Sequence, residues 1–137
     1  RGVVQPLLGS EPELLMITNR TLAKAESIVT DIKHDAFCAG SIEEAKKQPP
    51  DVIINCTSAS LTGDLPMVSD GLFSQCKLAY DMVYSAKATS FMNYAKEQGA
   101  RSAKDGFGML VEQAAAAFTI WTGKTPETAG VIQKLRP

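Results

Sequence analysis

The strongest constraint on the fold of this chain is an alternation of two apolar patterns. Short, largely apolar runs suit strands covered on both faces, and they occupy residues 13–18, 36–40, 51–55 and 77–84. Apolar residues recur at helical spacing over residues 21–34, 41–48, 89–99 and 106–121. Alternating strands and helices pack as a mostly parallel sheet between two layers of helices. The sequence therefore predicts a three-layer α/β/α fold.

Local signals predict where several elements begin and end. Ser41 and Glu44 have the spacing of a capping box, which predicts that a helix begins after Ser41. Thr125 followed by Pro126 predicts a last short helix with Pro126 at its first position. Residues 63–71 combine two glycines with a proline, so we expect a long loop there.

The first residues of the chain have the pattern of a helix interior. No capping residue precedes the apolar positions that recur at helical spacing, which are Val3, Val4, Leu7 and Leu8. Pro6 fits such a helix only within its first turn, where a missing N–H costs nothing. We therefore expect the 137 residues to be a fragment of a longer protein.

Composition narrows the classes of partner. The formal charge is -1 and the pI is about 5.8, so a nucleic-acid partner is not expected. No apolar stretch reaches the roughly 20 residues that span a bilayer, so no membrane partner is expected either. Three widely spaced cysteines indicate neither a disulfide framework nor a zinc site, and they favour a reducing, cytoplasmic compartment. The expected partner is a small molecule or a second copy of the chain in a homodimer.

Polar residues follow three of the predicted strands at the point where each strand ends. The sets are Asn19 to Thr21, Asn55 to Ser58, and Met82 to Tyr84. In an open parallel sheet, ligands bind outside the carboxyl ends of the strands. The topology alone therefore predicts a binding site at this edge of the sheet.

Arg20 indicates which nucleotide such a site would select. In a dinucleotide-binding fold, an acidic side chain after the second strand accepts hydrogen bonds from a free ribose 2′-hydroxyl, whereas an arginine suits a 2′-phosphate. This chain has Asn19 and Arg20 at that position, which favours NADP, with Thr21 at the helix start and Lys24 one turn on. In the alternative interpretation, Asn19 and Thr21 only form the turn and the cap, and Arg20 is a solvated charge.

Other features are weaker signals. The glycine-rich loop expected after a first strand is missing, and Gly106 and Gly108 match that fingerprint poorly. Gln113 interrupts an apolar helix face, where a buried amide needs hydrogen-bond partners from another helix or from a hydroxylated ligand. Trp121 lies on the apolar stripe of the same helix and is expected in the core. Cys56 lies near the predicted site but is expected to be a small packing residue.

Four segments resemble the carboxyl-terminal part of the shikimate dehydrogenase family. They are ITNRTLAKAESI, DVIINCTSASLTGDLP, YDMVYSAKATSF and DGFGMLVEQAAAAF, in this order and spacing. The Asn-Arg-Thr motif alone also occurs in other NADP-binding domains, such as glutamyl-tRNA reductases. Its combination with Tyr-Asp-Met-x-Tyr and Asp-Gly-x-Gly-Met-Leu-x-x-Gln-Ala is much more specific, and the similarity covers essentially the whole chain.

The resemblance implies that residues 1–137 form the Rossmann-like, doubly wound NADP-binding lobe of a two-lobed, metal-free oxidoreductase. Its reaction would interconvert 3-dehydroshikimate and shikimate within aromatic amino-acid and chorismate biosynthesis. By matched position, the implied cofactor-binding residues are Asn19, Arg20, Thr21, Lys24, Thr57, Ser58, Ala59, Met82, Gly106 and Met109. Tyr84 and Gln113 would face the substrate. Lys24 stands where the family often has an arginine and lacks its bidentate fork.

The resemblance also implies what this chain lacks. No catalytic residue is expected in it, because the lysine and aspartate that handle the proton belong to the family's amino-terminal lobe. The first strand and the glycine-rich loop would likewise lie outside the sequence, and the helices of residues 106–137 would pack back toward the substrate lobe. Two rival functions remain open: a quinate/shikimate dehydrogenase that uses NAD or NADP, and a non-catalytic dinucleotide-binding module.

Overall fold

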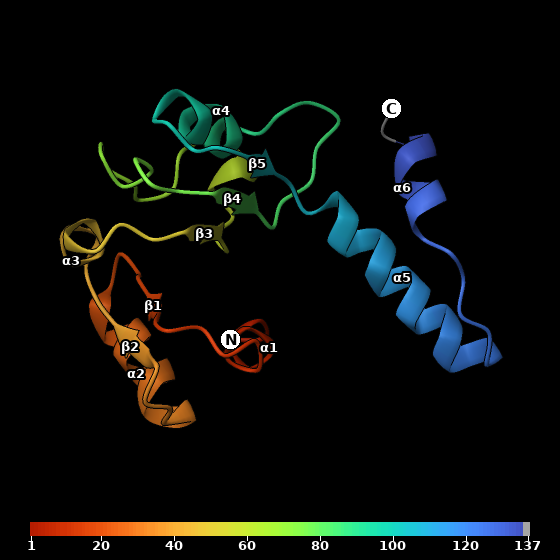
Figure 1. Cartoon of the computed structure of the whole chain (residues 1–137), viewed down its shortest axis with the longest axis horizontal. Coiled ribbons are helices and arrows are strands. Elements are labelled where there is room, and N and C mark those ends of the chain that lie inside the picture. Colours follow the sequence, from red (N-terminus) through yellow and green to blue (C-terminus); the bar gives the residue numbers. More distant parts are fainter. Residues whose placement is uncertain (136–137) are drawn as a thin grey trace. The chain divides into compact units, whose positions relative to one another are not determined.

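A computed structural model describes residues 1–135 of the chain and divides them into two compact units. Unit 1 comprises residues 1–50 and 67–72, and unit 2 comprises residues 51–66 and those from 73 onward. Every strand pair in both units is parallel. The predicted α/β class with parallel strands is therefore confirmed, and Figure 1 shows its helices and strands.

Unit 1 alternates helices with two short strands. Its elements are α1 (Val4–Leu8), β1 (Leu15–Ile17), α2 (Leu22–Ile32), β2 (Phe37–Ala39) and α3 (Ile42–Lys47). β1 and β2 pair in parallel, with Leu15 opposite Phe37. The predicted helix at the start of the chain is confirmed as α1, with Pro6 in its first turn. The core of the unit consists of buried Val4, Leu8 and Phe37, against which apolar residues of β1 and α2 pack.

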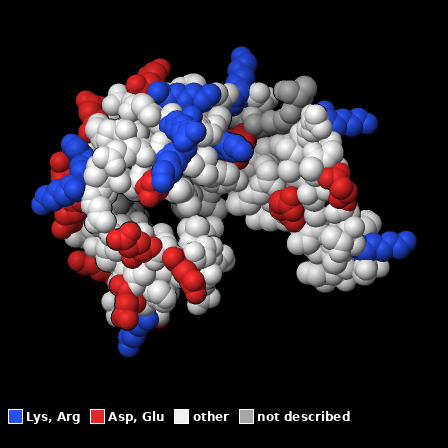
Figure 2. Space-filling view, viewed as in Figure 1, with Lys and Arg blue, Asp and Glu red and all other residues white. Residues whose placement is uncertain are grey.

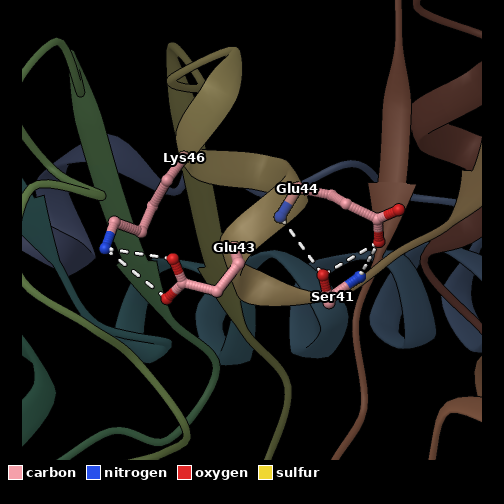
Figure 3. A network of polar contacts seen from close by, with 4 residues as sticks. All are labelled: Ser41, Glu43, Glu44 and Lys46. Carbon is pink, nitrogen blue, oxygen red and sulfur yellow. Dashed lines mark hydrogen bonds and ion pairs between the residues drawn. The ribbon is translucent and has the colours of Figure 1, made fainter.

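The capping box at the start of α3 is confirmed (Figure 3). The Glu44 backbone N–H donates to Ser41 Oγ at 3.2 Å, and the Ser41 backbone N–H donates to Glu44 Oε2 at 2.7 Å. These bonds satisfy two backbone donors that have no partner inside the helix. The hydrogen bonds from the Ser41 backbone and hydroxyl, with a smaller effect of Lys47, hold the pKa of Glu44 below its ordinary value.

Unit 2 contains a three-stranded sheet and the remaining helices. Its elements are β3 (Val52–Asn55), the 3₁₀ turn η1 (Ala59–Leu61), β4 (Leu78–Asp81), α4 (Ser90–Glu97), β5 (Ala103–Lys104), α5 (Phe107–Thr122) and α6 (Ala129–Leu135). The strand order is β3-β4-β5. The register places Val52 opposite Leu78 and Asn55 opposite Asp81. The two-residue strand β5 was not predicted, because so short a segment carries no periodic pattern.

The core of unit 2 lies between its sheet and α4. Phe73 is fully buried and contacts Phe91 and Tyr94 edge-on, with ring centroids 5.8 and 5.9 Å apart. α4 packs against β4 and β5 (Figure 1). Its first turn is capped by Thr89, whose Oγ1 accepts a hydrogen bond from the Met92 N–H at 3.2 Å. The loop predicted over residues 63–71 is confirmed, since it contains no helix or strand.

The apolar face of α5 is exposed, contrary to prediction. No residue of α5 is buried, and Ile120 and Trp121 are 81% and 82% exposed. The expectation that Trp121 lies in the core is therefore wrong. Burial requires an opposing surface, and within the described residues α6 is the main neighbour of α5. Uncharged side chains predominate over these two helices in the view of Figure 2.

The last helix begins later than predicted. α6 starts at Ala129, so the placement of Pro126 at its first position is wrong. The Gly130 N–H donates to the Glu127 carboxylate at 3.0 Å, and the Thr128 hydroxyl donates to Glu112 of α5 at 2.7 Å. The side chain of Glu127 therefore satisfies a backbone N–H in the first turn of α6. Pro126 lies before this turn, outside the helix.

Both sheets have an edge strand that pairs on one side only. Within residues 1–135, β1 pairs with β2 alone and β3 pairs with β4 alone. In the usual doubly wound strand order these two strands are the neighbours of the first strand. The pairing pattern agrees with the expectation that the first strand lies outside this sequence.

We predict that Ser41→Ala lowers the free energy of unfolding by about 1 kcal/mol near neutral pH, because α3 loses its side-chain cap. The pKa of Glu44 is lowered on folding, so its stabilising effect is complete above the ordinary value of 4.5. That effect is lost as the pH falls through the lower value of the folded state. Urea unfolding of the intact protein at several pH values should show a weaker acid dependence in Glu44→Gln.

Glu43→Gln is the matched control, since Glu43 lies in the same turn, pairs with Lys46 at 3.4 Å and takes no part in the capping box (Figure 3). An equal change of acid dependence in both variants would contradict the role assigned to Glu44.

Candidate functional site

The segment between β1 and α2 combines a turn with a helix start. The Asn19 side-chain oxygen accepts a hydrogen bond from the Thr21 backbone N–H at 2.9 Å. Thr21 occupies the N-cap position in extended backbone, but its side chain forms no capping bond. The alternative interpretation is confirmed in one part, since Asn19 forms the turn. It is wrong in another, since the Thr21 hydroxyl does not cap the helix.

The two cations of this segment have no carboxylate partner. Arg20 and Lys24 are exposed, and neither forms an ion pair with another residue in the described part of the chain. The first turn of α2 contains no acidic residue. The amino-terminal end of a helix carries a partial positive charge and unpaired N–H groups, which favour bound anions. The arrangement suits a phosphate group.

The segment after β3 is held by a buried amide. Asn55, 4% exposed, accepts hydrogen bonds from the Thr57 N–H at 3.0 Å and from the Thr57 hydroxyl at 2.8 Å. The Thr57 oxygen in turn accepts a bond from the Ala59 N–H at 3.3 Å. Thr57 and Ser58 are exposed, whereas Ala59 is half-buried at the start of η1. These three predicted cofactor-binding residues therefore form one short segment of restricted geometry.

Met82 and Gly106 are brought into contact although they lie 24 positions apart in the sequence. The Gly106 N–H donates to the Val83 carbonyl at 3.1 Å. A Cβ atom on Gly106 would collide with the carbonyl oxygen of Met82. Only glycine therefore allows the start of α5 to approach the loop after β4 so closely.

Two further contacts join the β4 loop to α5. The buried Asp105 carboxylate accepts hydrogen bonds from the Ser85 N–H at 3.1 Å and from the Phe107 N–H at 3.2 Å. The Tyr80 side chain is close enough to the backbone of Met109 for that backbone to affect the pKa of its hydroxyl. Burial is the main reason that the pKa of Tyr80 is raised, and the Asp105 charge adds to the rise. Met82, Gly106 and Met109 therefore share one region of unit 2.

Tyr84 and Gln113, the predicted substrate-facing residues, are both exposed. Tyr84 is 53% exposed in the loop after β4. The premise that Gln113 is buried is wrong, because the face of α5 on which it lies is open to solvent. Its amide is open to solvent and does not need a protein partner to offset burial.

The structure adds polar residues that sequence reasoning did not assign. Asp81 is fully buried at the end of β4, and Asn55, Ser60 and Thr89 donate hydrogen bonds to it. The available signal was a carboxylate that ends an otherwise apolar run, since a buried charge requires several hydrogen bonds to be tolerated. Its partners could not be found in the same way, because they come from three separate segments.

The cysteines and acidic residues indicate no separate site. Cys56 is exposed, so the expectation that it packs in the interior is wrong. Partial burial of its thiol raises the pKa of Cys56, which disfavours the reactive thiolate. The described residues contain no group of three metal-ligating side chains, and none of their helices has the length and apolar character needed to cross a membrane. On the face shown in Figure 2, charges of both signs are intermixed.

Comparison with known proteins gives matches over nearly the whole chain. The family model described as the shikimate 5′-dehydrogenase C-terminal domain matches residues 106–136. The shikimate dehydrogenase (NADP(+)) of Colwellia psychrerythraea is 46% identical over 136 residues, which are 99% of this chain and 50% of that protein. The enzyme of the same name from Nitrosospira multiformis is 47% identical over 141 residues, with the same two shares.

Solved structures also match nearly the whole chain. The Ael1 enzyme of Pseudomonas putida has a TM-score of 0.91 and 40% identity, covering 98% of this chain and 49% of that one. The shikimate dehydrogenase of Aquifex aeolicus has a TM-score of 0.75 and 28% identity, covering 98% of this chain and 48% of that one. The chain thus spans about half the length of the relatives that it matches.

We predict that Gly106→Ala lowers the free energy of unfolding by about 1–3 kcal/mol, because the new methyl group must displace the Met82 carbonyl. Gly108→Ala is the matched control. Gly108 lies two positions on, in α5, where a Cβ would meet no atom within 4 Å. We expect this second change to be neutral or to stabilise the helix by up to about 1 kcal/mol. Denaturant unfolding of both variants tests the contact, and equal effects would contradict it.

Proposed function

The chain belongs to the shikimate dehydrogenase family, and we propose that it forms the NADP-binding lobe of an enzyme that interconverts 3-dehydroshikimate and shikimate. The observation that carries this proposal is 46–47% identity, over 99% of the chain, to relatives named shikimate dehydrogenase (NADP(+)). The reaction belongs to aromatic amino-acid biosynthesis. The three free cysteines support a location in the reducing cytoplasm.

Selection of NADP is assigned to the segment between β1 and α2. Arg20 and Lys24 are exposed cations without an ion-pair partner among the described residues, and they flank the start of α2. Arg20 would bind the 2′-phosphate with two parallel hydrogen bonds, and Lys24 would add a point charge. Asn19 and Thr21 would complete the contact through the Asn19 Nδ2 group and the Thr21 hydroxyl, while the Thr21 N–H holds the Asn19 side chain in place.

The nicotinamide end is assigned to the carboxyl edge of the sheet in unit 2. Thr57, Ser58 and Ala59 would contact the cofactor from the segment after β3. Met82, Gly106 and Met109, which lie together near the start of α5, would flank the nicotinamide. Hydride transfer is the chemistry that the bound nicotinamide supplies, while these residues orient it and exclude water.

The substrate contacts are assigned to Tyr84 and Gln113. Both side chains are exposed, so their phenol and amide are free to bind the hydroxyls of shikimate. No residue of this chain is assigned to proton transfer. That step is assigned to groups in the part of the enzyme that the matched relatives contain in addition to the length covered here.

The exposed apolar face of α5 and α6 is assigned to contact with that further part. It includes Phe118, Ile120, Trp121, Val131 and Leu135, all of them at least 43% exposed. Contiguous apolar surface of this kind marks an interface. The remaining half of a relative's length is the first candidate for its occupant. A second copy of the chain, in a homodimer, is the other.

We predict that Arg20→Ala in the intact protein weakens NADPH binding by about 1.5–3 kcal/mol and leaves NADH affinity nearly unchanged, because only NADPH carries the 2′-phosphate. A binding titration with each cofactor measures the difference. Lys47→Ala is the control, since Lys47 is an exposed cation in the last turn of α3. Equal losses for the two cofactors would contradict the phosphate contact.

The same preparation tests the reaction. The wild-type protein should oxidise shikimate with NADP⁺ faster than with NAD⁺, followed by the absorbance of the reduced nicotinamide. Faster turnover of quinate with NAD⁺ would favour the quinate/shikimate branch. Cofactor binding without turnover of either substrate would favour the non-catalytic module.

We predict that Ile120→Asp lowers the free energy of unfolding of the intact protein by about 2 kcal/mol or more, because the face of α5 is covered there. An exposed position would tolerate the change within about 0.5 kcal/mol. Urea unfolding at several protein concentrations identifies the occupant. A concentration-dependent effect indicates a second copy, and a concentration-independent one indicates the rest of the same chain.

A further inference from the structure

Asp81 has an unusual environment for a charged residue. Its side chain is completely buried at the carboxyl end of β4. Oδ1 accepts hydrogen bonds from Asn55 Nδ2 and from the Val83 N–H, both at 3.1 Å. Oδ2 accepts from the Ser60 hydroxyl at 2.6 Å and from the Thr89 hydroxyl at 2.7 Å. Four donors therefore surround the two carboxylate oxygens, which can accept about four hydrogen bonds.

No cation among residues 1–135 lies within ion-pair distance of this carboxylate. Within residues 1–135, Asp81 forms no ion pair with a lysine, an arginine or the histidine. Removing a carboxylate from water is costly, and here only neutral donors compensate for it. An apolar residue in the same space would leave the four donors without an acceptor, so the role of the carboxylate lies in the groups that it holds.

The four donors come from the two loops that leave the same edge of the sheet. Asn55 lies before Thr57 in the sequence, and Ser60 lies after it. Asn55 also accepts two hydrogen bonds from Thr57, so the position of Asn55 restricts that of Thr57. Val83 adjoins Met82, and Thr89 caps α4 at the far end of the second loop. One carboxylate therefore forms hydrogen bonds with both segments.

The second loop is also held from its other side. Asp105 accepts the Ser85 N–H, and the Gly106 N–H donates to the Val83 carbonyl. These contacts link the loop to α5 but not to the segment after β3. The side-chain bonds of Asp81 join the β3 loop to the β4 loop, and two further bonds support the same junction: Met82 N–H to the Asn55 carbonyl at 3.0 Å and the Ser90 hydroxyl to the Asp64 carbonyl at 2.8 Å.

We propose that Asp81 is a positioning residue for the nicotinamide end of the cofactor site. It does not touch the cofactor. It holds Thr57 to Ala59 and Met82 in the geometry in which they receive the nicotinamide, acting through Asn55, Ser60, Val83 and Thr89. This inference rests on the proposed function, and it adds a residue to which neither the sequence motifs nor the cofactor contacts assign a role.

The test is Asp81→Asn in the intact protein. The amide keeps the size of the side chain but replaces one acceptor oxygen by a donor, so the Ser60 and Thr89 hydroxyls lose their shared acceptor. We expect NADPH affinity and kcat with shikimate each to fall about tenfold or more. Affinity for adenosine 2′,5′-bisphosphate, which carries the 2′-phosphate but no nicotinamide, should stay within about twofold, since Arg20 is unaffected.

Asp64→Asn is the matched control. Asp64 is exposed, and its carboxylate accepts a hydrogen bond from the Thr62 hydroxyl at 2.7 Å. It therefore undergoes the same change of charge in unit 2 without entering the Asp81 network. Its NADPH affinity and kcat should equal those of the wild type.

Substitution of a donor provides a second test that does not alter the buried charge. Thr89→Val removes the hydroxyl and should lower kcat and NADPH affinity in the same sense as Asp81→Asn. Thr89→Ser keeps both the bond to Asp81 and the cap on Met92, so it should restore both values. This pair decides the question if Asp81→Asn does not fold.

Each outcome separates the inference from the proposed function. If the wild type neither binds NADPH nor oxidises shikimate, the proposed function is wrong. If the wild type is active and Asp81→Asn matches it, the positioning role is wrong. If Asp81→Asn loses affinity for NADPH and for adenosine 2′,5′-bisphosphate by the same factor, Asp81 stabilises the fold without positioning the nicotinamide end.

Discussion

Parallel strand pairing is the constraint on which the rest of this structure depends. When β3, β4 and β5 run in the same direction, the segments that follow them leave from one edge of the sheet. Asn55 and Asp81 end their strands in register, and Lys104 lies opposite Tyr80. The polar residues that follow are thereby collected in one place without any attraction among themselves. The binding edge of the sheet is a consequence of topology.

The two units bind their proposed parts of the cofactor with different physical means. In unit 1, Arg20 and Lys24 are exposed and lack a carboxylate partner in the described chain. An anion bound there would interact with both charges, and the two side chains would lose little of their hydration. In unit 2, the proposed contacts lie on segments that buried groups such as Asn55 and Asp81 hold in place. In the proposed site, charge would select the phosphate, and loops held in place by buried groups would contact the uncharged ring.

The face of α5 and one edge of each sheet are uncovered within the described residues. Ile120 and Trp121 are apolar but open to solvent, and β1 and β3 each lack a neighbour on one side among the described residues. Apolar surface and free backbone groups of this extent are rarely left uncovered in a finished protein. They fit the observation that the matched relatives are about twice as long as this chain.

Features that depend on neighbours in the sequence were predictable. The Ser41 capping box involves residues three positions apart, and the parallel α/β class follows from runs of residues alone. Features that depend on distant segments were not. Trp121 was wrongly expected in the core, because burial requires a surface that the helical pattern does not specify. The role of Asp81 emerged only when strand register brought Asn55 beside it and two loops supplied hydroxyls, because hydrogen bonds between distant segments leave no periodic signal in the chain.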